Sequence, residues 1–156
     1  ATADNQVEIA RALIEAGADV NQKNRIQDSP YLLAGASGYN QILSLTLSHG
    51  ADLKSTNRYG GTALIPACER GHVETVRLLI AAGVDLNHVN RLGWTCLLEA
   101  IVLADGGPAH QQIVAQLIAA GADLNLPDRA GISPLQQAER RGQSAIAKLL
   151  RDAGAA

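Results

Sequence analysis

A set of glycines recurs along the chain at an almost constant interval. Gly17, Gly50 and Gly83 follow one another at 33 residues, and the same interval joins Gly121 to Gly154. An aspartate stands two positions after each of the first four glycines. Intervals of this length are typical of stacked repeats, in which each unit buries its apolar face against its neighbours. The interval therefore predicts a solenoid of similar units and argues against one closed globule.

The central unit, residues 57–89, begins with the pattern of a short helix. Thr62 is a candidate N-cap, because its hydroxyl can accept a hydrogen bond from an unpaired amide of the first turn. The apolar run Ala63–Cys68 follows directly. Pro66 lies inside this run and has no amide hydrogen, so we expect a distorted first turn.

A second helix follows in the same unit. Gly71 ends the first helix, and the apolar residues between Val73 and Ile80 then recur at helical spacing. Gly83 ends the second helix, and the segment Asp85–Asn90 has the composition of a turn. One unit is thus a helix, a break, a second helix and a turn.

The same sequence of helix-start residues and helix-ending glycines divides the whole chain into units. The interval from Thr95 to Ser133 is 38 residues, which is five more than elsewhere. The extra residues fall at 104–108, and we expect Pro108 to open a lengthened second helix. The alignment also places Ala1 inside a first helix, so we expect a longer protein in which at least one unit precedes it. The predicted segments are 1–23 (partial), 24–56, 57–89, 90–127 (with the insertion) and 128–156 (a C-terminal cap).

The repeated motifs resemble those of the ankyrin-repeat family, over nearly the whole chain. The helix starts are Ser29-Pro30-Tyr31-Leu32, Thr62-Ala63-Leu64-Ile65, Thr95-Cys96-Leu97-Leu98 and Ser133-Pro134-Leu135-Gln136. The closing segments are Gly17-Ala18-Asp19-Val20-Asn21, Gly50-Ala51-Asp52-Leu53, Gly83-Val84-Asp85-Leu86-Asn87 and Gly121-Ala122-Asp123-Leu124-Asn125. The chain departs from the family where it lacks the histidine usual at the third helix position.

The resemblance implies a fold and a function. The expected fold is an all-α ankyrin-repeat solenoid, a single domain over residues 1–156, in which protruding β-turn or hairpin tips join the helix pairs. The expected function is non-catalytic binding of a partner protein on the concave face formed by the tips and first helices. Bacterial members can carry an Asp-Gly-Gly-Pro loop in the penultimate repeat, as at Asp105–Pro108, and some are exported to the periplasm.

Composition and charge narrow the classes of partner. Hydrophobic residues make up 47% of the chain but aromatic residues only 3%, which suits closely packed short helices. The formal net charge of −2 gives no electrostatic reason to expect nucleic acid. No apolar run approaches the roughly 20 residues of a membrane span. We therefore predict a protein partner and expect no cofactor. The resemblance to bacterial members suggests that the protein is periplasmic if a signal peptide lies upstream and cytoplasmic otherwise.

Histidines and cysteines are the residues on which an enzymatic function would depend. The four histidines show no metal-ligand spacing. Cys68 and His72 are four residues apart, but Gly71 interrupts the helix that would align them as nucleophile and base. Parallel, in-register helices would place Cys68 and Cys96 about 12 Å apart, so we expect two free thiols. An enzyme or enzyme-associated subunit, based on these residues and His110, remains the less favoured alternative.

The concave surface holds the candidate binding residues. Arginine occupies the second position of every turn, and tyrosine, leucine or tryptophan stands close by in two of them. Exposed aromatic residues beside arginine are typical of interface hot spots. First-helix positions such as Glu69 and Glu99 adjoin these turns. The residues predicted to bind a partner are Arg25, Arg58, Tyr59, Arg91, Leu92, Trp94, Glu99 and Arg129.

Other interpretations of this surface stay open. The arginines could form a solvated charged edge, and Tyr59 and Trp94 could pack against neighbouring turns. The domain could also be a structural spacer within a longer ankyrin array.

We expect a monomer that could associate through its uncapped N-terminal end.

Overall fold

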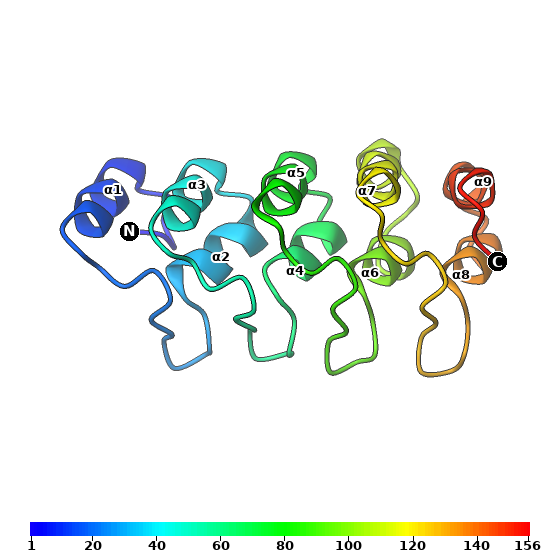
Figure 1. Cartoon of the computed structure of the whole chain (residues 1–156), viewed down its shortest axis with the longest axis horizontal. Coiled ribbons are helices and arrows are strands. Elements are labelled where there is room, and N and C mark those ends of the chain that lie inside the picture. Colours follow the sequence, from blue (N-terminus) through cyan, green and yellow to red (C-terminus); the bar gives the residue numbers. More distant parts are fainter.

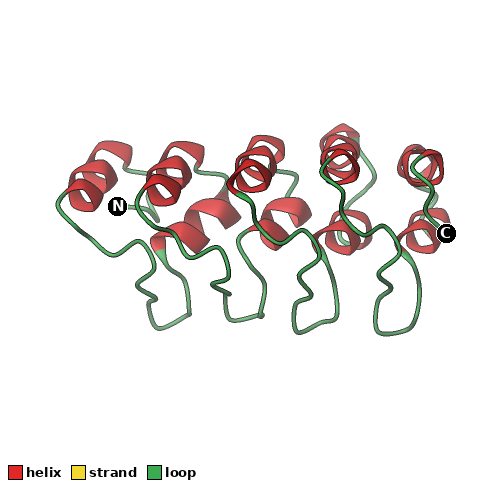
Figure 2. Cartoon of the chain, in the orientation of Figure 1, coloured by secondary structure: helices red, strands yellow, loops and turns green.

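The computed structural model describes residues 1–156, and helices are its only regular secondary structure (Figure 2). The all-α prediction is therefore confirmed. The helices are α1 (Val7–Glu15), α2 (Pro30–Ser37), α3 (Asn40–Ser48), α4 (Leu64–Glu69), α5 (Val73–Ala82), α6 (Cys96–Val102), α7 (Pro108–Ala119), α8 (Pro134–Arg140) and α9 (Ser144–Asp152).

The helices stand in two rows (Figure 1). The even-numbered helices form one row and the odd-numbered helices the other, and long turns project from the side of the even-numbered row. Each even-numbered helix packs against the helix that follows it and against its neighbours in its own row. We call the even-numbered helices the first helices. Their apolar residues join those of the other row in a continuous core of 26 buried residues.

Most first helices begin with the capping residue that the sequence predicts. The hydroxyls of Ser29, Thr95 and Ser133 accept hydrogen bonds from the amides three residues later, at 3.1, 3.2 and 3.3 Å. Pro30 and Pro134 occupy the first helical position, where the missing amide costs no hydrogen bond. Pro108 likewise opens α7, which confirms the predicted start of the lengthened helix.

The prediction that Thr62 caps its helix is wrong. Its buried hydroxyl has no hydrogen-bond partner, and α4 begins only at Leu64. Pro66 explains the difference, because it has no amide to bond to the Thr62 carbonyl. That carbonyl accepts from the Ile65 amide instead, at 3.3 Å, so the first turn is tighter than an α-helical turn. The distortion expected at Pro66 is present.

One side chain fixes the shape of each projecting turn. In the turn before α4, Asn57 Oδ1 accepts from the amides of Tyr59 and Gly61, at 2.9 and 3.1 Å. The Asn57 amide donates in turn to the Gly61 carbonyl at 2.9 Å. The same pair of side-chain bonds is made at the equivalent positions of the other turns, which are Asn24, Asn90 and Asp128. Such bonds let Asn and Asp hold a tight turn without help from the rest of the fold.

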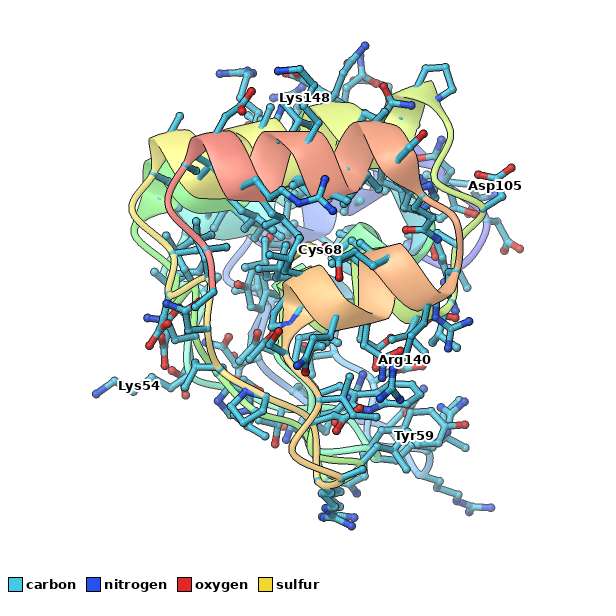
Figure 3. The ribbon with its side chains drawn as sticks, turned by 90° about the vertical axis from the view of Figure 1, so that its right-hand side faces the viewer. Lys54, Tyr59, Cys68, Asp105, Arg140 and Lys148 are labelled. Atoms are coloured by element: carbon cyan, nitrogen blue, oxygen red, sulfur yellow. A yellow bond between two sulfur atoms is a disulfide. The ribbon has the colours of Figure 1, made fainter.

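The cysteines form a disulfide, so the prediction of two free thiols is wrong. Cys68, near the end of α4, is bonded to Cys96 at the start of α6, and their Cα atoms are 5.6 Å apart. The error lies in the assumed register of consecutive first helices, because the end of one helix meets the beginning of the next. Gly35 in α2 faces Ala63, just before α4, with the same offset. Figure 3 shows Cys68 inside the stack.

We predict that the disulfide contributes about 3 kcal/mol to the free energy of unfolding, because it closes a loop with a sequence separation of 28 residues. Equilibrium unfolding in guanidinium chloride, with and without dithiothreitol, measures this difference. A variant with both Cys68→Ala and Cys96→Ala is the control, and its unfolding midpoint should not respond to the reductant. Equal stability of the oxidised and reduced native sequence would contradict the prediction.

Candidate functional site

A groove lies in the angle between the projecting turns and the first helices. Its volume is about 360 Å³, and side chains from α2, α4, α6 and the turns before them line it. Four of the predicted binding residues are in its lining, namely Arg58, Tyr59, Leu92 and Glu99. Arg25, Arg91, Trp94 and Arg129 are outside it. The structure thus brings half of the predicted set together.

Tyr59 is the most prominent side chain on the rim of the groove. It is 55% exposed and lies beneath the first helices, on the same side of the turns as Arg140 and opposite Lys54 (Figure 3). The guanidinium carbon of Arg58 is 4.7 Å from the centre of its ring, a cation–π contact that holds the ring in place. Leu92, one turn further on, is also 55% exposed. These two side chains give the groove an apolar rim.

Two of the turn arginines, Arg91 and Arg129, join one turn to the next. Arg91 donates from its amide to the Tyr59 carbonyl at 3.0 Å and from Nη1 to the Arg58 carbonyl at 2.9 Å. Its side chain lies across Gly60, where an added Cβ would come within 2.8 Å of Arg91 Cγ. Arg129 donates to the Arg91 carbonyl in the same way. This structural role had no signal in the sequence beyond the regular spacing.

Trp94 is half-buried, although its position in the turn suggested full exposure. Its amide donates to Asn90 Oδ1 at 3.1 Å, and its carbonyl accepts from the Asn90 amide at 3.0 Å. The backbone of Trp94 is therefore part of the folded turn that also carries Leu92.

A buried carboxyl group forms the floor of the groove. Glu99 is only 4% exposed, and Asn90 Nδ2 donates to its Oε1 at 2.8 Å. Burial raises the pKa of Glu99 to about 7, although the bond from Asn90 opposes the rise. Glu69, also in the lining, raises this pKa further by charge repulsion and by a hydrogen bond that only a protonated Glu99 can donate. Glu99 therefore keeps its proton at higher pH than an ordinary glutamate does.

Comparison with known proteins identifies the fold. A family model described as "Ankyrin repeats (3 copies)" matches residues 31–128, and a single "Ankyrin repeat" model matches residues 1–25. This chain belongs to the ankyrin-repeat family. A search of curated proteins found no significant match.

Two solved structures show how closely this ankyrin-repeat chain follows known ones. An ankyrin repeat domain from Acinetobacter baumannii AYE is 68% identical, with a TM-score of 0.98 over 99% of this chain and 79% of that one. The ankyrin repeat protein EF0377 is 44% identical, with a TM-score of 0.93 over 96% of this chain and 76% of that one. The predicted ankyrin-repeat solenoid is thus confirmed. Ankyrin repeats are generally protein-interaction modules and generally non-catalytic.

In this ankyrin-repeat domain, each histidine considered for catalysis contacts the end of the first helix in the preceding repeat. His110 Nε2 donates to the Glu69 carbonyl at 2.8 Å, and its ring lies over Gly71. His72 lies over Gly38 in the same manner. Burial lowers the pKa of His72, against the effect of its bond to the Ala36 backbone. With Cys68 in the disulfide, all three residues of the enzymatic alternative have structural contacts.

Nowhere do three or more His, Cys, Asp or Glu side chains come together as metal ligands could. None of the helices combines the length and the apolar character that crossing a bilayer requires.

We predict that Glu99 makes the ankyrin-repeat domain less stable as pH rises from 5 to 8. The folded-state pKa of about 7 exceeds the ordinary value of 4.5, so the folded protein holds a proton that the unfolded chain has lost. The free energy of unfolding should therefore fall by about 2 to 3 kcal/mol over this range through Glu99. Glu99→Gln should remove this loss, because the amide oxygen can still accept from Asn90.

Urea unfolding at pH 5, 6, 7 and 8 gives the free energy of unfolding of the native sequence and of Glu99→Gln. The effect of Glu99 is the difference between these two free energies at each pH. Both proteins contain the same histidines, so the contribution of the histidines cancels in this difference. Parallel pH profiles for the native sequence and Glu99→Gln would show that Glu99 ionises normally.

Proposed function

We propose that residues 1–156 act as one non-catalytic domain that binds a partner protein in the groove between the turns and the first helices. Two features support this proposal. Exposed apolar side chains adjoin polar ones in the groove, and its rim residues Tyr59 and Leu92 are each more than half exposed. The turns that carry them are tied together by Arg91, so the surface is preorganised. Preorganisation lowers the entropy cost of binding.

Tyr59 is the single residue on which the proposal depends most. A tyrosine ring offers a large contact area at little entropy cost, and its hydroxyl can bond to a partner. Arg58 already fixes the ring at 4.7 Å, so binding would immobilise little that is still free. The proposed binding residues are therefore Arg58, Tyr59, Leu92 and Glu99 in the groove, with Arg25, Arg91, Trp94 and Arg129 supporting or flanking it.

We propose the same division into repeats that the sequence suggests, with segments 1–23, 24–56, 57–89, 90–127 and 128–156. The groove then spans the second, third and fourth of these segments. A partner segment lying along it would contact several repeats at once.

We predict that Tyr59→Ala combined with Leu92→Ala weakens binding of the natural partner by about 100-fold, because each substitution removes an interface residue worth more than 1 kcal/mol. The partner is first isolated from the source organism with the native domain, and calorimetry then gives both affinities. The melting temperature should change little, since both side chains are exposed.

A matched control uses two exposed apolar residues from the other row of helices. Ile9 and Leu13 in α1 are 51% and 52% exposed, and their replacement by alanine should leave the affinity unchanged. Stronger weakening by this control pair than by the groove pair would move the binding surface to the other row.

A further inference from the structure

The floor of the groove contains two acidic side chains and no cation that pairs with them. Glu99 is 4% exposed, and Glu69 is close enough to raise its pKa. Neither takes part in any of the salt bridges of the structure. The one side-chain donor to Glu99 is the neutral amide of Asn90, at 2.8 Å. A buried carboxylate without a cation is costly, and proteins seldom keep one without a compensating partner.

The cations that line the groove are committed elsewhere. Arg58 lies over Tyr59 and approaches the Asp28 carboxylate at 4.0 Å. Arg70 donates from Nη1 to the Ala36 carbonyl at 2.7 Å. The groove therefore holds two arginines with contacts of their own and two glutamates without a cationic partner.

Other repeats do not carry this acidic pair. The positions equivalent to Glu99 are Leu33 in α2, Pro66 in α4 and Gln137 in α8. Gln137 joins the same two positions with the roles reversed, since its Nε2 donates to Asp128 Oδ2 at 2.6 Å. Leu33 and Pro66 cannot make such a bond, yet Asn24 and Asn57 still hold their turns. A carboxyl group at this helix position is therefore not needed to hold a turn, and Glu99 needs a different explanation.

The walls of the groove suit a long, partly apolar side chain. Tyr59, Leu92 and Leu103 line it and are 55%, 55% and 47% exposed. They line the same groove as the buried Glu99 and the half-buried Glu69. A side chain that enters past them must be apolar along its stem and positive at its tip.

We propose that the groove receives an arginine side chain of the partner protein, with its guanidinium between Glu69 and Glu99 and its aliphatic stem against Tyr59 and Leu92. This inference rests on the function proposed above. Arginine fits better than lysine, because its planar group presents several donors at once and is more weakly hydrated. In the free protein the proton held by Glu99 takes the place of that charge.

Two peptides that differ only in charge test the inference. The probe is acetyl-Gly-Ala-Arg-Ala-Gly-amide, and its control carries citrulline, the neutral isostere of arginine. Nitrogen–proton correlation spectra at pH 8 give both dissociation constants and the residues whose signals shift. We expect the arginine peptide to shift the signals of Tyr59, Leu92 and Glu99, and to bind about ten-fold more tightly than the citrulline peptide.

Single neutral substitutions test the two carboxyl groups. Glu69→Gln and Glu99→Gln should each reduce the preference for arginine over citrulline at least three-fold, while the folded spectrum is kept. Glu74→Gln is the control, because Glu74 is exposed on α5 and paired with Arg77, outside the lining of the groove. It should leave the preference unchanged.

Equal affinity for both peptides, shifts confined to another surface, or no saturable binding would overturn the inference. If the natural partner nevertheless loses affinity with Tyr59→Ala and Leu92→Ala, the proposed function stands without the arginine. If the arginine peptide binds in the groove and the partner ignores those substitutions, the proposed function fails instead.

Discussion

Close approach between consecutive first helices is the contact on which the stack depends. An added Cβ at Gly35 would come within 2.9 Å of the Ala63 Cβ, so only the smallest residues fit where α2 meets the next unit. At the equivalent junction of α4 and α6, Cys68 and Cys96 replace this close packing with a covalent bond. The position selects small side chains in one case and a disulfide in the other. Both solutions bring neighbouring units near enough to share one core.

The groove combines two separate kinds of stabilisation. The turns are shaped by local hydrogen bonds that the side chains of Asn57 and Asn90 accept from backbone amides, and they are joined by arginine contacts between turns. The floor comes from the first helices, whose positions are set by the buried core. Because Glu99 bonds to Asn90, the floor and the wall are also connected directly. A charge change at Glu99 can therefore reach the turn that carries Leu92 through one hydrogen bond.

The fold and several local features could be predicted from the sequence because they depend on residues close together in the chain. Capping by Ser29 and Thr95, the start of α7 at Pro108 and the disturbance at Pro66 all follow from the conformational limits of single residues. The disulfide could not be predicted in this way, because it depends on the offset between consecutive helices. The role of Arg91 depends likewise on how one turn lies on the next. The place of Glu99 on the concave face could be predicted from its position in the repeat. Its altered pKa could not, because it depends on surroundings that include Asn90 and Glu69.

Because a disulfide couples α4 to α6, the covalent connection across the groove depends on the redox conditions around the protein. Such bonds persist where thiol reductants are scarce, whereas the glutathione pool of the cytosol keeps most cysteines reduced. The groove spans this junction, with Glu69 next to Cys68 in one helix and Glu99 three residues after Cys96 in the other. Outside the cell interior the two acidic side chains would be carried on covalently coupled helices. Inside it, only packing would fix the distance between them.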